Sequence, residues 1–184
     1  ADADKILSEL DVLVNSIDRD VFASRVAHEL QEQMDIRVLV GGDQDATRPT
    51  FMTKPFFSLS QNRDYVAVEN LIEISERPNG PSYTNRIHLI SPKVDLNELE
   101  RDQDTQFFAA TLVALYTLTN EIALLDASGV LSSDIAEEQT YRVGMGGSFE
   151  YQRAKYVRDI EGFGVLEVLG GNLLLVPKEQ ISRL

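Results

Sequence analysis

The chain has 184 residues and a formal net charge of −13, with 43% hydrophobic and 26% charged residues. This composition is typical of one folded domain and excludes a disordered chain. The absence of cysteine excludes disulfides, thiolate metal sites and cysteine nucleophiles. We expect a single domain over residues 1–184, with residues 1–17 as a possible N-terminal helical arm.

The charge is unevenly distributed along the chain. Residues 94–140 hold ten acids and one base, whereas residues 141–184 hold five acids and six bases. A net negative chain is repelled by the nucleic-acid backbone, so we expect no tight binding of nucleic acid. We see no signal peptide and no apolar run as long as the ~20 residues of a membrane span. The expected location is the cytoplasm or a virion, without contact to a membrane.

The N-terminal third is expected to be helical and then to enter a strand. Apolar residues recur at helical spacing over residues 3–34 in two stripes, separated at Asn15–Asp18, where several residues are typical helix caps. This pattern predicts a pair of helices. Residues 36–40 then predict a short β-branched strand, followed by a polar loop through residues 41–50.

Three alternating segments follow, at residues 51–60, 65–75 and 82–91, and the intervening turns are short enough for hairpins. In the third segment Tyr83, Ile87 and Leu89 share one face, while Thr84, Arg86 and His88 share the other. The pattern predicts an antiparallel meander with one solvated side.

A helix is expected from Leu96 to a stop near Gly129, and it is apolar on nearly all sides, so it needs more than one packing partner. Strands are expected again at residues 141–145, 149–160, 165–169 and 173–176, the last two joined across Gly170-Gly171-Asn172. The predicted fold class is α+β: an antiparallel β-meander packed against an N-terminal helix pair and a long central helix, with a C-terminal β-hairpin.

No pattern in the sequence predicts a catalytic, cofactor or metal site. Neither of the two histidines, His28 and His88, has a partner at the spacing of a zinc helix, and we interpret both as surface or structural residues. The acidic pairs at Asp43/Asp45 and Asp102/Asp104 lack the glycine and the final acid of a calcium loop. We expect no cofactor, no metal and no enzymatic activity.

One glycine-rich stretch, Gly144-Met145-Gly146-Gly147-Ser148, fails the patterns of a dinucleotide loop, a phosphate loop and a nucleophile elbow. A hairpin or bulge between strands is the simpler interpretation. Because loops on rigid scaffolds often make contacts, Gly144, Met145, Gly146 and Gly147 are candidate interaction residues. Phe107 and Tyr116, on the second apolar side of the predicted helix, are the other two candidates.

Basic and aromatic residues alternate after this stretch. Single-strand binders combine such residues for phosphate contact and base stacking, but a half-exposed strand has the same alternation, and we favour the strand. The residues are Arg142, Phe149, Tyr151, Arg153, Lys155, Tyr156 and Arg158.

The features that remain are an N-terminal arm, a sheet edge, a helix that is apolar on nearly all sides, a long polar loop and a glycine-rich hairpin. Features of these kinds often form contacts between subunits. The leading hypothesis is a non-enzymatic structural or assembly protein that forms a homo-oligomer. The order of elements resembles that of tail-terminator and neck (head-tail connector) proteins of tailed bacteriophages, although no residue motif carries the resemblance. The resemblance implies a component of a phage tail or neck whose partners are copies of itself and neighbouring structural proteins.

Two other functional classes remain as alternatives. An acidic adaptor or secretion-type chaperone would hold a partner polypeptide in an apolar groove and is expected to be a dimer. An enzyme or ligand-binding domain would assemble its site from residues distant in sequence, such as His28, His88, Tyr141 and acidic residues.

Overall fold

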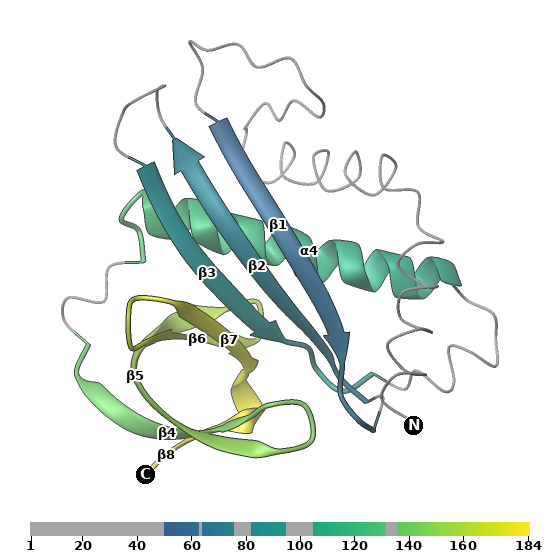
Figure 1. Cartoon of the computed structure of the whole chain (residues 1–184). Coiled ribbons are helices and arrows are strands. Elements are labelled where there is room, and N and C mark those ends of the chain that lie inside the picture. Colours follow the sequence, from purple (N-terminus) through teal and green to yellow (C-terminus); the bar gives the residue numbers. More distant parts are fainter. Residues whose placement is uncertain (1–49, 63, 76–81, 95–104, 132–135) are drawn as a thin grey trace.

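The computed structural model describes residues 50–62, 64–75, 82–94, 105–131 and 136–184. Within these ranges the chain forms an eight-stranded mixed sheet in the order β1-β2-β3-β7-β6-β5-β4-β8, with a single α-helix, α4, beside it. Figure 1 shows the helix crossing behind β1, β2 and β3 while the later strands curve round below them.

The first three strands form an antiparallel meander. They are β1 (Thr50–Leu59), β2 (Val66–Ser75) and β3 (Ser82–Ile90), and the expected segments agree with them to within one residue at each end. Their alternation has a simple origin, because successive side chains of a strand point to opposite faces. Val66, Val68 and Ile72 of β2 are fully buried on the side of the helix.

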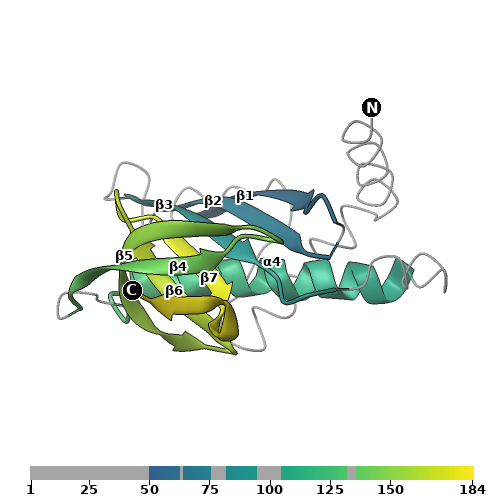
Figure 2. The ribbon, with the colours of Figure 1, turned by 90° about the horizontal axis from the view of Figure 1, so that it is seen from below.

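Helix α4 (Thr105–Ala127) covers one face of this meander. Leu112, Leu115, Leu118 and Ile122 pack with the apolar side chains of the strands, and Figure 2 shows the helix along that side of the sheet. The chain leaves the helix through Gly129, whose φ of +76° is the left-handed conformation that often ends a helix. Residues 95–104, in which the sequence predicts the start of this helix, lie outside the described residues.

The remaining strands form a curled five-stranded half of the sheet. They are β4 (Glu138–Gly144), β5 (Phe149–Ile160), β6 (Phe163–Val168), β7 (Leu173–Pro177) and β8 (Ile181–Arg183), with a 3-10 turn, η1 (Lys178–Gln180), before the last. The curl brings β8 back to pair with β4. Its inner side holds a second core of Tyr141, Val143, Ala154, Leu166, Leu174 and Val176.

Strand β7 joins the two halves because it pairs in parallel with β3 and antiparallel with β6. All five of its residues are buried. Leu173 and Leu175 belong to the core under α4, whereas Leu174 and Val176 belong to the second core. This continuous apolar run is what a strand with both faces covered requires.

The predicted fold class is therefore wrong. The structure is mostly one eight-stranded mixed sheet with a single described helix, and the expected C-terminal hairpin is only part of a five-stranded curl. The expected hairpin does form, as the antiparallel pair β6–β7, but it lies inside the sheet because β7 also pairs with β3. The predicted helix pair and the strand at residues 36–40 lie outside the described residues.

Candidate functional site

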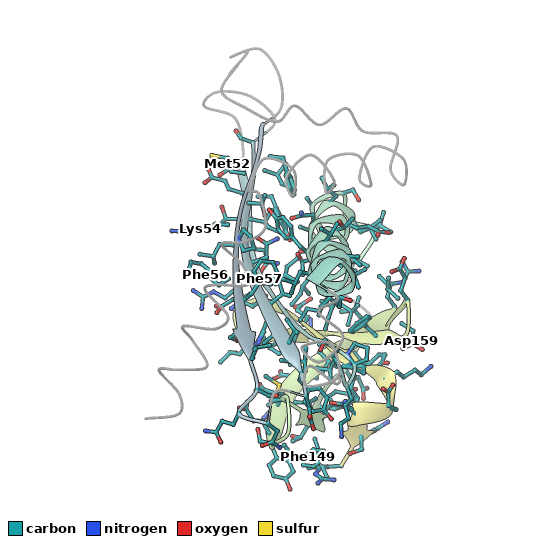
Figure 3. All side chains as sticks on the ribbon, turned by 90° about the vertical axis from the view of Figure 1, so that its right-hand side faces the viewer. Met52, Lys54, Phe56, Phe57, Phe149 and Asp159 are labelled. Atoms are coloured by element: carbon teal, nitrogen blue, oxygen red, sulfur yellow. The ribbon has the colours of Figure 1, made fainter. Side chains whose placement is uncertain are left out.

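The outer face of the meander, on the side away from α4, carries an unusual mixture of exposed apolar residues and paired charges. Met52 and Phe56 of β1 and Leu71 of β2 are 53%, 49% and 37% exposed. Figure 3 shows Met52, Lys54 and Phe56 on this side of β1, whereas Phe57 points toward the helix. We call the set Met52, Lys54, Phe56, Glu69, Leu71, Glu73 and Arg86 the outer patch.

The charges of the outer patch balance. Arg86 pairs with Glu69 at 3.1 Å, and the Lys54 ammonium lies 5.5 Å from the centre of the Phe56 ring. Two cations and two carboxylates thus make the patch neutral, although the chain carries a net charge of −13. Among the described residues, neither Lys54 nor Glu73 has an ion-pair partner.

Strand β1 is the edge of the sheet as far as the structure describes it. Pro55 is compatible with an edge strand, because proline has no backbone N–H to donate to a neighbouring strand. Lysine and proline within an edge strand also discourage the addition of another strand. The face of β1 is therefore a better contact surface than its hydrogen-bonding edge.

A pocket of about 270 Å³ opens at one end of this face, where β1 ends and β2 begins. Three strands and the hairpin between β4 and β5 supply its walls. They are Ser58, Leu59, Ser60, Tyr65, Val66, Ala67, His88, Ile90, Met145, Gly146 and Glu150. The pocket thus joins the glycine-rich stretch to His88, which we interpreted from the sequence as a surface or structural residue.

The turn between β1 and β2 forms one wall of this pocket and is held by its own hydrogen bonds. The Ser60 hydroxyl oxygen accepts from the backbone N–H groups of Asp64 and Tyr65, each at 3.1 Å. Lys93 pairs with Asp64 at 3.3 Å, and Val94 N–H donates to the Asp64 carbonyl. The wall at Ser60 and Tyr65 is therefore fixed from two sides.

The glycine-rich stretch packs against that turn. Gly146 and Gly147 have φ values of +75° and +100°, which a residue with a side chain rarely adopts. A Cβ atom at Gly146 would lie 3.5 Å from Ser60 and from Tyr65. Met145 is half-buried against the second core, and Gly144 is buried beside Gln180. These four candidate residues make contacts within the chain, and two of them line the pocket.

His88 is a partly buried titratable group in the pocket wall. Burial lowers the pKa of its imidazole below the ordinary value, against the opposing influence of the Glu69 and Glu150 carboxylates. The lowered pKa favours the neutral imidazole, which offers one N–H donor and one nitrogen acceptor. In the described part of the chain it has no hydrogen-bond partner.

Tyr116 lies in the core between α4 and the sheet. Its hydroxyl donates to the Thr53 oxygen at 3.0 Å, and Thr53 donates to Asn70 at 2.7 Å. The Asn70 amide donates to Thr119 at 2.9 Å and to Asn120 at 2.8 Å. This buried polar network holds α4 against β1 and β2. The Phe107 side chain is outside the described residues.

The sequence analysis missed the outer patch and the role of His88 in a pocket. One signal pointed to the patch: residues 51–57 carry Phe51 and Phe57 on one face and Met52 and Phe56 on the other. A strand that is apolar on both faces needs a second partner. Tyr141 does not reach the pocket, because its ring packs on Tyr156 in the second core. His28 lies outside the described residues.

Within the described ranges there is no cluster of three or more histidine and acidic side chains that could hold a metal ion. In the same ranges no helix is long and apolar enough to span a bilayer. No protein-family model matches this chain, and neither curated proteins nor solved structures give a significant match.

Proposed function

We propose that this chain is a non-enzymatic assembly protein that works as a homo-oligomer and associates through the outer patch. The observation that carries the proposal is the combination of exposed Met52, Phe56 and Leu71 with balanced charges on one sheet face. Exposed apolar residues that gather on one face are typical of an interaction surface, whereas single ones are ordinary.

The charge of the chain favours this face as the place where copies meet. Two molecules with a net charge of −13 repel each other, so they associate best where the local charge is zero or complementary. Lys54 and Glu73 have no ion-pair partner among the described residues. In a two-fold dimer the Lys54 of one copy can pair with the Glu73 of the other.

The first test is the molar mass in solution, measured by light scattering after size exclusion. Phe56→Ser removes an apolar anchor of the patch and is expected to lower the mass toward that of the monomer. Leu169→Ser is the matched control, because Leu169 is 89% exposed in a turn outside the patch. An unchanged mass for Phe56→Ser, or an equal loss for Leu169→Ser, contradicts the proposal.

A charge exchange tests the two-fold pairing more sharply. Lys54→Glu and Glu73→Lys are each expected to weaken self-association, because each places like charges opposite one another. Mixing the two variants restores opposite charges at both contacts, so the mixture is expected to form a heterodimer. Failure of the mixture to associate, while each variant stays folded by circular dichroism, excludes this pairing.

A role in a phage tail or head-tail connector is the narrower form of the proposal and rests on the predicted order of elements, of which the structure describes the meander and the long helix. A salt-insensitive dimer that captures one defined polypeptide would instead favour the adaptor or chaperone class.

A further inference from the structure

The pocket beside the outer patch has the size and polarity of a site for a small group. Its volume of about 270 Å³ lies below the roughly 300–1,000 Å³ of pockets that hold drug-sized ligands or cofactors. It is large enough for an amino-acid side chain or a small organic molecule.

The walls of the pocket separate into an apolar part and an acceptor-rich part. The partly exposed Leu59, Ala67 and Met145 offer apolar contacts to an aliphatic stem, whereas Val66 and Ile90 border the pocket but are almost fully buried. A stem of several methylene groups gains about 0.8 kcal/mol for each group that it buries. The occupant should therefore have a short hydrocarbon section.

The polar groups of the lining favour a cation over an anion. Glu150 supplies a carboxylate, and among the described lining residues there is no lysine or arginine. Gln152 donates to Glu150 Oε2 at 3.0 Å, and the other carboxylate oxygen has no partner within the described ranges. The neutral His88 ring and the Ser58 and Tyr65 hydroxyls add acceptors.

We propose that this pocket binds an alkylammonium group, such as the end of a lysine side chain, with Glu150 and His88 as its acceptors. The ammonium group has three donors and no acceptor, which matches a wall of acceptors, and its methylene stem matches the apolar wall. The inference goes beyond self-association and does not depend on it. The lysine of another copy, the lysine of a different polypeptide and a free amine are three sources of the same chemistry.

The test is a titration of the full chain with Nα-acetyl-lysine N-methylamide, followed by NMR of the His88 ring. The His88 signals are identified by their loss in the His88→Gln variant. The lysine amide is expected to shift these signals in a saturable way and to lower the His88 pKa, because a nearby cation disfavours imidazolium. The matched control is Nα-acetyl-norleucine N-methylamide, which has a similar stem and no ammonium.

Glu150→Gln removes the carboxylate and keeps the shape of an exposed side chain, so the variant should fold. An exposed ion pair is worth about 0.2–1 kcal/mol, so the affinity for the lysine amide should fall by roughly 1.4- to fivefold. No shift with the lysine amide, an equal shift with the norleucine amide, or an unchanged affinity in Glu150→Gln overturns the proposal.

The molar mass during the same titration separates the lysine of another copy from the other two sources. If the lysine of another copy occupies the pocket, the amide also lowers the molar mass. If a different polypeptide or a free amine is the natural occupant, the His88 signals shift while the mass stays constant. Both outcomes support the pocket, and the charge-exchange experiment on the outer patch tests self-association separately.

Discussion

At the scale of single residues, Glu121 shows how burial changes the energy of a charged group. Burial on α4 raises the pKa of its carboxyl group, and the nearby Glu161 carboxylate raises it further. A carboxyl group whose pKa is higher in the folded state lowers the stability of the fold once the pH exceeds the unfolded pKa. This cost is absent in acid, where Glu121 is protonated in both states.

Glu121→Gln is therefore expected to raise the melting temperature at pH 7 and to leave it unchanged at low pH. Surface charges are worth about 1 kcal/mol or less, which corresponds to less than about 4 °C for a domain of this size. Differential scanning calorimetry between pH 3 and pH 7 measures the difference. Glu137→Gln, at an exposed position before β4, is the control and should change nothing. A gain that persists at pH 3 would contradict this explanation.

Asp159 has the opposite effect on the pH dependence of folding stability. The hydrogen bonds that it accepts from Lys178 and Tyr156 lower the pKa of its carboxyl group. The stability that these bonds contribute is present above the unfolded pKa and is lost as the pH falls through the folded pKa. Asp159→Asn is expected to remove this part of the acid dependence, as urea unfolding at a series of pH values can measure.

At the scale of elements, one carboxylate fastens the end of α4 to β3. The Tyr83 hydroxyl donates to Asp126 Oδ2 at 2.6 Å, and the Asn85 amide donates to the same oxygen at 3.0 Å. Asn85 also donates to the Gly171 carbonyl in the turn between β6 and β7 at 3.1 Å. The helix end, the meander and the curled half of the sheet therefore meet at Asp126 and Asn85.

Asp126→Ala should cost about 1.5–3 kcal/mol, the usual worth of hydrogen bonds to a charged group. Tyr83→Phe removes only one of the two bonds and should cost less. Urea unfolding of both variants, with a common slope, measures the two values. A larger loss for Tyr83→Phe than for Asp126→Ala would show that packing of the tyrosine, and not the carboxylate, holds the helix end.

The elements also show what the sequence could and could not predict. The three meander strands and the strands β4 to β7 were predicted, because their alternation and the turns between them are local signals. Strand β8 has only three residues, too few for a pattern. The central place of β7 depends on pairing with β3, whose partner residue Ile87 lies 86 positions before Leu173.

The candidate site was predictable only in part. The glycine-rich hairpin was identified from its composition, but no local sequence pattern indicates that Gly146 lies close to Ser60 and Tyr65. His88 was assigned correctly to the polar side of its strand, yet its pocket exists only because the hairpin with Glu150 folds over that strand. Such contacts come from the curl of the whole sheet.

At the scale of the whole molecule, two apolar cores share the strands β6 and β7. Leu175 is buried in the core under α4, and its neighbour Leu174 is buried in the second core. Because one strand serves both cores, we expect them to unfold together. Two separate domains would instead unfold independently.

Leu174→Ala and Leu175→Ala are each expected to cost about 2–5 kcal/mol, the usual range for a buried leucine. Each variant should still unfold in a single transition. Urea unfolding followed by circular dichroism, together with hydrogen exchange of β2 and β5 amides, measures this coupling. Loss of protection in β5 alone for Leu174→Ala would show that the curled half is an independent unit.

The position of β7 near the end of the described sequence has a consequence for biosynthesis. While the ribosome is still translating the chain, β3 has already emerged with β1 and β2, but the strand that pairs with its other side does not yet exist. The nascent meander then exposes an unpaired edge and the apolar residues beneath it, a state prone to pairing with the wrong chain. Slow translation between β3 and β7 should therefore lengthen the interval in which the nascent chain depends on a chaperone.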